Sequence, residues 1–135
     1  FGEPSPDSPH VCSPAEFGPL AAEWTPRNAG HWRFGGFTGD YNGIHLWDAY
    51  AHRLGFPRAL FHPQRILGEC LSRLPGACSH GTPQRLDAWL KGPVPHGTPV
   101  RMHEASGTDE TTFALFVEPE RPCIVGRLTR LSSSR

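Results

Sequence analysis

The clearest helical signal in this sequence lies between Pro63 and Leu74. Five apolar residues of that segment recur at positions i, i+1, i+4, i+5 and i+8, which places them on one face of an α-helix. The pair Pro75-Gly76 stops the helix sharply. The sequence therefore predicts one amphipathic helix with a continuous apolar face, made of Ile66, Leu67, Cys70, Leu71 and Leu74.

The chain after this helix alternates apolar and polar residues, as strands do when one face packs on a core. The segment Gly107-Thr-Asp-Glu110 suits a connection between two such strands. Because helices come first and about four antiparallel strands follow, the order predicts an α+β layer with a long helix on a curved sheet. The expected strand faces are Leu86, Ala88 and Leu90; Phe113, Leu115 and Val117; and Cys123, Val125 and Leu131.

The composition divides the chain into two parts. Residues 1–20 are rich in Pro, Ser and Gly and are expected to form an extended lead-in, whereas residues 21–135 are expected to form a single domain. The first residues have neither a basic lead nor an apolar stretch, so we expect no signal peptide. Shorter helices are predicted from Arg27 to Phe37 and from about Leu46 to Leu54, the second ending at Gly55.

Composition and cysteine spacing exclude several classes of protein. Thirteen basic and thirteen acidic side chains give a net charge of zero, and no basic stripe favours nucleic acid. The apolar runs are too short to span a membrane. The spacing of Cys70, Cys78 and His80 fits no known zinc pattern, so we expect no metal. Four sparse cysteines, Cys12, Cys70, Cys78 and Cys123, indicate a reducing, cytoplasmic setting with Cys70 as a buried apolar residue.

A polar turn from Thr38 to His45 carries the best candidate for chemistry. A carboxylate and an imidazole in a shared, partly dry pocket can act as general acid and base, and Asp40 and His45 supply these groups. Taken singly, Asp40 is typical of a turn and His45 of a helix start; at this spacing, both are predicted to be catalytic. Asn42 is expected to fix the turn through hydrogen bonds to the backbone. Most other histidines have no motif around them and are expected to be exposed or satisfied: His10, His31, His52, His80, His96 and His103.

The same turn resembles the hydratase signature of the MaoC-like family, which includes (R)-specific enoyl-CoA hydratases and 3-hydroxyacyl dehydratases. The similarity extends roughly from Thr25 to Leu131 and includes Lys91-Gly-Pro-Val-Pro95 and Gly126-Arg-Leu128. The resemblance implies a hotdog fold, in which a curved antiparallel sheet wraps a long central helix, and a homodimer. The signature residues that match are Thr38, Gly39, Asp40, Asn42, Ile44 and His45.

The resemblance also implies an activity. Family members add water to, or remove it from, the C2–C3 bond of an acyl thioester in biosynthetic and related pathways. The acyl group is carried by coenzyme A or by the phosphopantetheine arm of an acyl carrier protein, and no further cofactor is expected. By this resemblance Asp40 and His45 hold the reacting water between them. Arg58 and Arg65 could meet phosphates of the carrier, although plain surface charge is favoured.

Two positions depart from the family pattern. Gly43 stands where the family has Pro, which removes no functional group. The family has His-Gly-Met at the start of the central helix, where the Gly N–H binds the thioester oxygen, but this chain has His62-Pro63-Gln64. Because proline has no N–H, that donor is absent, and losing one such donor costs on the order of 10²–10³ in turnover. Gln64 could supply a substitute, so Asn42, Pro63 and Gln64 are the candidate substrate-binding residues.

Three hypotheses follow. The first is a hydratase or dehydratase of an acyl or polyketide-like thioester that uses Asp40 and His45. The second keeps both residues in a tailoring enzyme that dehydrates, cyclises or isomerises a biosynthetic intermediate without the usual oxyanion donor. The third is a hotdog subunit that binds an acyl chain without catalysis. Asp40 and His45 argue against the third hypothesis, and Pro63 argues against the simplest form of the first.

Overall fold

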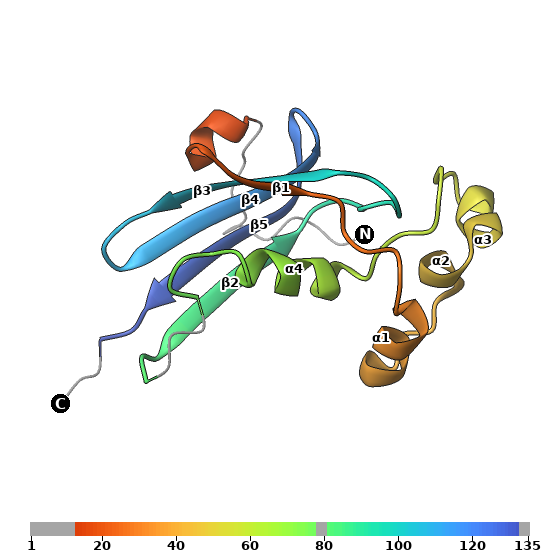
Figure 1. The fold of residues 1–135 in the computed structure, drawn as a ribbon, viewed down its shortest axis with the longest axis horizontal. Coiled ribbons are helices and arrows are strands. Elements are labelled where there is room, and N and C mark those ends of the chain that lie inside the picture. The colour runs from red at the N-terminus through yellow and green to blue at the C-terminus, as the bar shows by residue number, and fades with distance from the viewer. Residues whose placement is uncertain (1–12, 78–80, 133–135) are drawn as a thin grey trace.

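The computed structural model describes residues 13–77 and 81–132 of the chain. Five strands form one antiparallel sheet in the order β1-β3-β4-β5-β2, and a helix lies against it (Figure 1). This arrangement is the α+β hotdog fold, so the fold class predicted from the sequence is confirmed. Residues 1–12, Cys78 and His80 lie outside the described residues. The strands are β1 (Leu20–Trp24), β2 (Gln84–Leu90), β3 (Val100–Ser106), β4 (Glu110–Glu118) and β5 (Arg121–Arg130).

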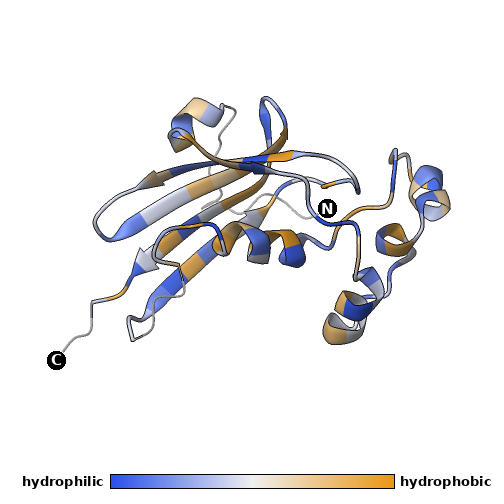
Figure 2. Ribbon diagram, viewed as in Figure 1, coloured by the Kyte–Doolittle hydropathy of each residue, from blue (hydrophilic) through white to orange (hydrophobic). Residues whose placement is uncertain are grey.

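The helix on the sheet is α4 (Pro63–Leu71), with Pro63 in its first turn. Proline favours this position because the first N–H groups of a helix have no partner within it. The helix ends three residues earlier than predicted, because Arg73 and Leu74 donate to carbonyls only three residues back. Leu74 nevertheless packs into the core together with Ile66 and the thiol of Cys70. Alternating hydrophobic and hydrophilic segments along α4 are visible in Figure 2.

The core lies between α4 and the sheet. Opposite residues Phe113 and Gly126 pair across β4 and β5, and a side chain on Gly126 would place its Cβ 2.1 Å from Phe113. Gly126 therefore makes room for that aromatic ring. The cluster on this face comprises Phe61, Ile66, Cys70, Leu74, Val94, Val100, Met102, Phe113, Leu115, Cys123 and Ile124.

A smaller cluster covers the opposite face of the sheet. Phe17 lies in the short 3-10 helix η1 (Pro14–Phe17) and packs against Phe116 there. The sequence predicts that Val125 and Cys123 lie on the same face of their strand, and this prediction is wrong. Val125 belongs to the Phe17 cluster, whereas Cys123 belongs to the main core. Both faces of β5 are covered, and an irregularity in its pairing with β4 shifts the register, so simple alternation does not describe this strand.

The edges of the sheet differ from the sequence prediction in two ways. Strand β1, which pairs with β3, was not predicted, and its residues are mostly exposed or half-buried. On the other edge, the predicted face of Leu86, Ala88 and Leu90 is exposed, with Leu86 38% and Leu90 46% accessible. Edge position explains this exposure, because β2 has a neighbouring strand on one side only.

Three short helices, α1 (His31–Thr38), α2 (Gly43–Leu46) and α3 (Asp48–Arg53), lie beyond one end of the sheet (Figure 1). We call residues 31–62 the overhang. The helix predicted from Leu46 to Leu54 corresponds to α3, which begins only at Asp48 because Trp47 before it is extended (φ −136°, ψ 124°). Helix α2, which precedes it, was not predicted. The helix predicted from Arg27 begins only at His31. The described helices are all too short or too polar to cross a membrane.

Candidate active site

The overhang turn is folded by its own polar side chains. The Thr38 hydroxyl donates to the Phe34 carbonyl at 2.9 Å and accepts from the Asp40 N–H at 3.3 Å. Asp40 Oδ1 accepts from the Asn42 N–H at 3.1 Å, and Asn42 Oδ1 accepts from the Ile44 N–H at 3.1 Å. Asn42 is thereby the N-cap of α2. These hydrogen bonds fix the turn between Asp40 and α2, the helix that contains His45.

Gly43, which stands where the family signature has Pro, is explained by the packing around it. A side chain at this position would place its Cβ 3.0 Å from the Tyr50 ring and 3.1 Å from Trp47. The aromatic side chains of this chain therefore fill the space that a larger residue would need. Here the first turn of α2 is fixed by the Asn42 cap.

The turn brings Asp40 and His45, the dyad, together. His45 Nε2 lies 3.5 Å from Asp40 Oδ2, with side chains 12% and 43% exposed respectively. His45 Nδ1 lies 2.9 Å from the Leu60 carbonyl, which can only accept, so Nδ1 carries a proton and donates it. In the neutral ring Nε2 then holds the lone pair that faces the carboxylate. A separation of 3.5 Å is long for a direct hydrogen bond, so both groups retain capacity to bind the same water.

His62 contacts both members of the dyad. Its ring stacks on that of His45, with centroids 4.1 Å apart and planes 25° apart. Its Nε2 donates to the Asp40 carbonyl at 3.1 Å, while its buried Nδ1 finds no hydrogen-bond partner among the described residues. Burial lowers the pKa of His62 despite the opposing hydrogen bond to Asp40. A neutral imidazole therefore holds both members of the dyad, which the sequence reading did not foresee.

His31 and His96 form a second stacked pair, with ring centroids 4.0 Å apart. His96 is 5% exposed, and its Nε2 finds no partner in the described part of the chain. His31 is hydrogen-bonded to Asn28 Oδ1 at 2.7 Å, as expected. For His96 the expectation of an exposed or satisfied side chain is wrong, because the ring is buried and its Nε2 has no partner among the described residues. Burial, followed by the charges of His96 and Arg65, lowers the pKa of His31 to about 4. No sequence motif could have revealed this pair, because 65 residues separate its members.

An apolar groove of about 770 Å³ opens beside His45. It runs between the overhang and the sheet, and among the described residues that line it only His45 and Lys91 are ionisable. Ligand sites usually combine such an apolar wall with a few placed polar groups. The apolar side chains that line it are Ile44, Leu54, Phe56, Leu60, Phe61, Pro63, Pro93, Leu90, Val94 and Ile124.

The three candidate substrate-binding residues have different placements. Pro63 lines the groove and, as a proline, has no N–H to donate there. Gln64 is exposed and does not line the groove. The Asn42 side chain is used to cap α2. The structure thus brings Pro63 to the groove, leaves Gln64 outside it, and uses Asn42 to shape the turn.

The two candidate phosphate-binding arginines are already engaged. Arg65 donates to the carbonyls of Ala29 and Arg27 and lies 3.8 Å from Glu69. It therefore ties α4 to the segment that leads into the overhang. Arg58 is exposed and lies 3.8 Å from Asp48.

The same cluster could also be considered as a metal-binding site. Asp40, His45 and His62 each offer one potential ligand atom, and these atoms lie within 4.8 Å of one another. The two imidazoles are stacked, however, so their in-plane lone pairs run side by side and do not converge on one point. The arrangement therefore fits acid–base chemistry better than metal binding.

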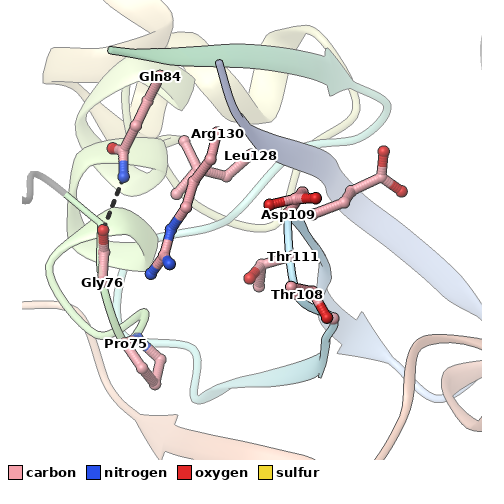
Figure 3. Close-up of a pocket in the computed structure, with 10 residues that line it drawn as sticks. Pro75, Gly76, Gln84, Thr108, Asp109, Thr111, Leu128 and Arg130 are labelled. Carbon is pink, nitrogen blue, oxygen red and sulfur yellow. Dashed lines mark hydrogen bonds between the residues drawn. The ribbon is translucent and has the colours of Figure 1, made fainter. Parts of the chain in front are cut away.

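The hollow in Figure 3 is not a substrate site. Its volume is about 20 Å³, close to the space that one water molecule requires. Gln84 and Arg130 from the sheet line it, and the Gln84 amide donates to the Gly76 carbonyl at 2.8 Å. It lies among the β3–β4 turn and residues after α4, and it shares no lining residue with the apolar groove.

The buried histidines predict a loss of stability in mild acid. The pKa values of His31, His62 and His96 are all lowered from 6.5, in each case chiefly by burial. Below about pH 6.5 the unfolded chain therefore binds more protons than the folded chain. The free energy of unfolding consequently decreases as the pH is lowered. We expect urea unfolding midpoints to decrease from pH 7 to pH 5, and to decrease less in His96→Phe. Equal slopes for both proteins would contradict this account.

Comparisons with known proteins support the fold. No protein-family model matches this chain, and no curated protein matches it. Among solved structures, the (R)-hydratase from A. caviae involved in PHA biosynthesis superposes with a TM-score of 0.64 at 21% identity, covering 85% of this chain and 96% of that chain. The unliganded R-hydratase PhaJ1 from Pseudomonas aeruginosa superposes with a TM-score of 0.55 at 20% identity, covering 93% of both chains.

HtdX from Mycobacterium tuberculosis superposes with a TM-score of 0.67 at 24% identity. The alignment covers 96% of this chain but only 49% of HtdX, so this chain spans about half the length of that protein. These neighbours agree with the resemblance seen in the signature turn. At identities below 25% they establish the hotdog fold of this chain.

Proposed function

We propose that this protein adds water to, or removes water from, the C2–C3 bond of an acyl thioester carried on coenzyme A or on an acyl carrier protein. The observation that carries this proposal is His45, whose Nδ1–H is held by Leu60 and whose Nε2 faces the Asp40 carboxylate beside an apolar groove. The hydratase fold of the structural neighbours supports it.

The reaction needs one proton acceptor and one proton donor. In the hydration direction, one member of the dyad removes a proton from water as the water oxygen bonds to C3. The dyad then returns that proton to C2, so the double bond becomes a 3-hydroxyacyl group with no net gain or loss of a proton. Dehydration runs through the same steps in reverse, with loss of the C2 proton and protonation of the departing hydroxide. The 3.5 Å gap between His45 and Asp40 suits a water held by both.

Pro63 favours a second candidate function. The thioester oxygen gains negative charge during the reaction, and its usual donor is a backbone N–H at the start of the helix. Pro63 lines the groove and has no N–H. A tailoring reaction, such as dehydration, cyclisation or isomerisation of a substrate that needs no such donor, is compatible with this groove.

The deciding experiment is hydration of trans-2-enoyl-CoA by the wild-type protein, followed as loss of the absorbance of the conjugated thioester. Under the first proposal the absorbance falls in proportion to enzyme concentration. A folded protein that leaves every enoyl-CoA unreacted but converts a biosynthetic thioester intermediate supports the tailoring role. Binding of acyl-CoA without any conversion points to a non-catalytic subunit.

We further propose that two copies pair through β2. This strand is an edge of the sheet, and its exposed side chains include Leu86 and Leu90. Edge strands with apolar residues are ready-made pairing surfaces. We expect light scattering to give about twice 14.9 kDa, and Leu86→Lys to lower that mass toward the monomer. A monomeric wild-type protein at micromolar concentration would overturn this pairing.

A further inference from the structure

His62 lies where the overhang meets α4, and its side chain is 0% exposed. It is the N-cap of α4, yet its side chain makes no hydrogen bond to the helix. Polar side chains at this position usually accept from a backbone N–H of the first turn. The imidazole contacts the dyad instead, so its place in the fold is explained by the dyad and not by the helix.

We propose that His62 is a positioning residue that holds Asp40 and His45 apart, at a separation where both can contact one water molecule. The separation is the 3.5 Å between His45 Nε2 and Asp40 Oδ2. The inference rests on the proposed function, because it takes that water as the reactant. Its structural part, the distance between the two side chains, does not depend on any reaction.

The gap between the two side chains needs support because a direct contact is favourable. An imidazolium and a carboxylate form a charge-assisted hydrogen bond at about 2.7–2.9 Å, which is stronger than a neutral one. Such a bond would occupy His45 Nε2 and Asp40 Oδ2 with each other. At the observed separation, an oxygen atom off the line that joins them can lie about 2.8 Å from both. A small movement of either side chain would therefore remove the place for the water.

Two contacts fix the plane of the His45 ring. The Leu60 carbonyl holds its edge, 2.9 Å from Nδ1. The His62 ring covers its face, with centroids 4.1 Å apart and planes 25° apart. The hydrogen bond alone would leave the ring free to tilt about Nδ1, and the stacked ring blocks that tilt on one side. His62 is itself packed against Phe34, with ring centroids 4.9 Å apart.

The same imidazole fixes the backbone of Asp40. His62 Nε2 donates to the Asp40 carbonyl at 3.1 Å, and the Asn42 N–H donates to Asp40 Oδ1 at 3.1 Å. The main chain and one carboxylate oxygen of Asp40 are thus both anchored, and the other oxygen, Oδ2, faces His45. One buried side chain therefore sets the positions of both dyad members.

His62 does this without carrying a charge. Its Nε2 holds the proton that it donates to Asp40, so a second proton would have to bind Nδ1, which is buried and has no partner among the described residues. Burial accordingly lowers the pKa of His62. The ionisable groups around it are Asp40, His45, His31 and Arg65. A positive charge on His62 would repel a proton on His45, so a neutral ring is the form that supports the dyad.

Two substitutions separate the two contacts. His62→Gln places an amide N–H near the position of Nε2, so it keeps a donor for Asp40 and loses the stacked ring. His62→Phe keeps a ring against His45, fills the buried space and loses the donor. His52→Gln is the matched control, because His52 Nε2 also bonds a backbone carbonyl, that of Pro57 at 2.7 Å, but on the exposed side of α3.

The test combines nitrogen-15 NMR of the imidazoles with steady-state kinetics on trans-2-enoyl-CoA. We expect wild-type His45 near neutral pH to show a protonated Nδ1 and an unprotonated Nε2. In both His62 variants Nε2 should shift toward the protonated signal as it closes on Asp40. Turnover should fall by about tenfold or more while KM changes by less than about threefold, because the groove that binds substrate is untouched. His52→Gln should resemble wild type in both measurements.

Other results would overturn the inference. An unchanged Nε2 signal in both folded variants, with or without a loss of turnover, would mean that His62 does not set the separation. A change in one variant alone would contradict the claim that His62 holds both Asp40 and His45. The expected NMR change, together with no turnover of any enoyl-CoA by the wild type, would instead retain the positioning role and refute the hydratase function.

Discussion

Asp40→Asn and His45→Ala should each lower turnover of the native substrate by about 10²–10⁴, the range typical of general acid–base catalysis. Asp40 Oδ2 and His45 Nε2 face each other across 3.5 Å, so neither group can handle the shared water alone. The double variant should consequently be little worse than either single variant, because residues that act as a unit are not additive. Steady-state kinetics of the three variants on one substrate measure this directly.

Two controls separate chemistry from folding. Asp109→Asn changes an exposed carboxylate near the small hollow in Figure 3, at a distance from the groove, and should leave turnover unchanged. Thermal unfolding of Asp40→Asn should resemble wild type, because asparagine can still accept the Asn42 N–H. Full activity in either single variant of the dyad would refute the proposed roles. So would additive losses of the two variants.

Pro63→Gly should raise turnover of trans-2-enoyl-CoA if the protein is a thioester hydratase with a missing oxyanion donor. Glycine restores an N–H in the first turn of α4, and N–H groups there have no partner within the helix. Pro63 lines the groove in which the thioester is proposed to bind. One donor is worth up to about 10²–10³ in turnover. The gain should appear mainly in kcat, because the oxygen carries its charge only as the reaction proceeds.

Stability provides the control for this variant. Glycine is a more flexible helix start than proline, so Pro63→Gly should lose up to about 1 kcal/mol in the free energy of unfolding. Pro75→Gly removes an exposed proline that lines the small hollow and should leave kcat unchanged. A folded Pro63→Gly variant with no gain on enoyl-CoA would favour the tailoring reaction over simple hydration.

The sequence by itself determined the fold class and the position of the main helix. The spacing of Ile66, Cys70 and Leu74 predicts the helix face that the core contains, because helix periodicity is a local property. The turn from Thr38 to His45 is also locally determined, since Thr38 and Asn42 bind backbone groups within a few residues. This is why a short motif was sufficient to locate Asp40 and His45. Strand faces were less predictable, as Val125 shows, because pairing with β4 sets the register of β5.

Only the tertiary structure decided what surrounds the dyad. The stacking of His62 on His45 brings the N-cap of α4 against α2, and the pairing of His31 with His96 joins residues far apart in the chain. The groove depends on the overhang lying against Val94 and Ile124 of the sheet region. Burial and ring contacts of this kind arise between segments that share no local pattern. The sequence could therefore propose Asp40 and His45 as catalytic residues, while the histidines packed against them and the groove beside them emerge only when the chain is folded.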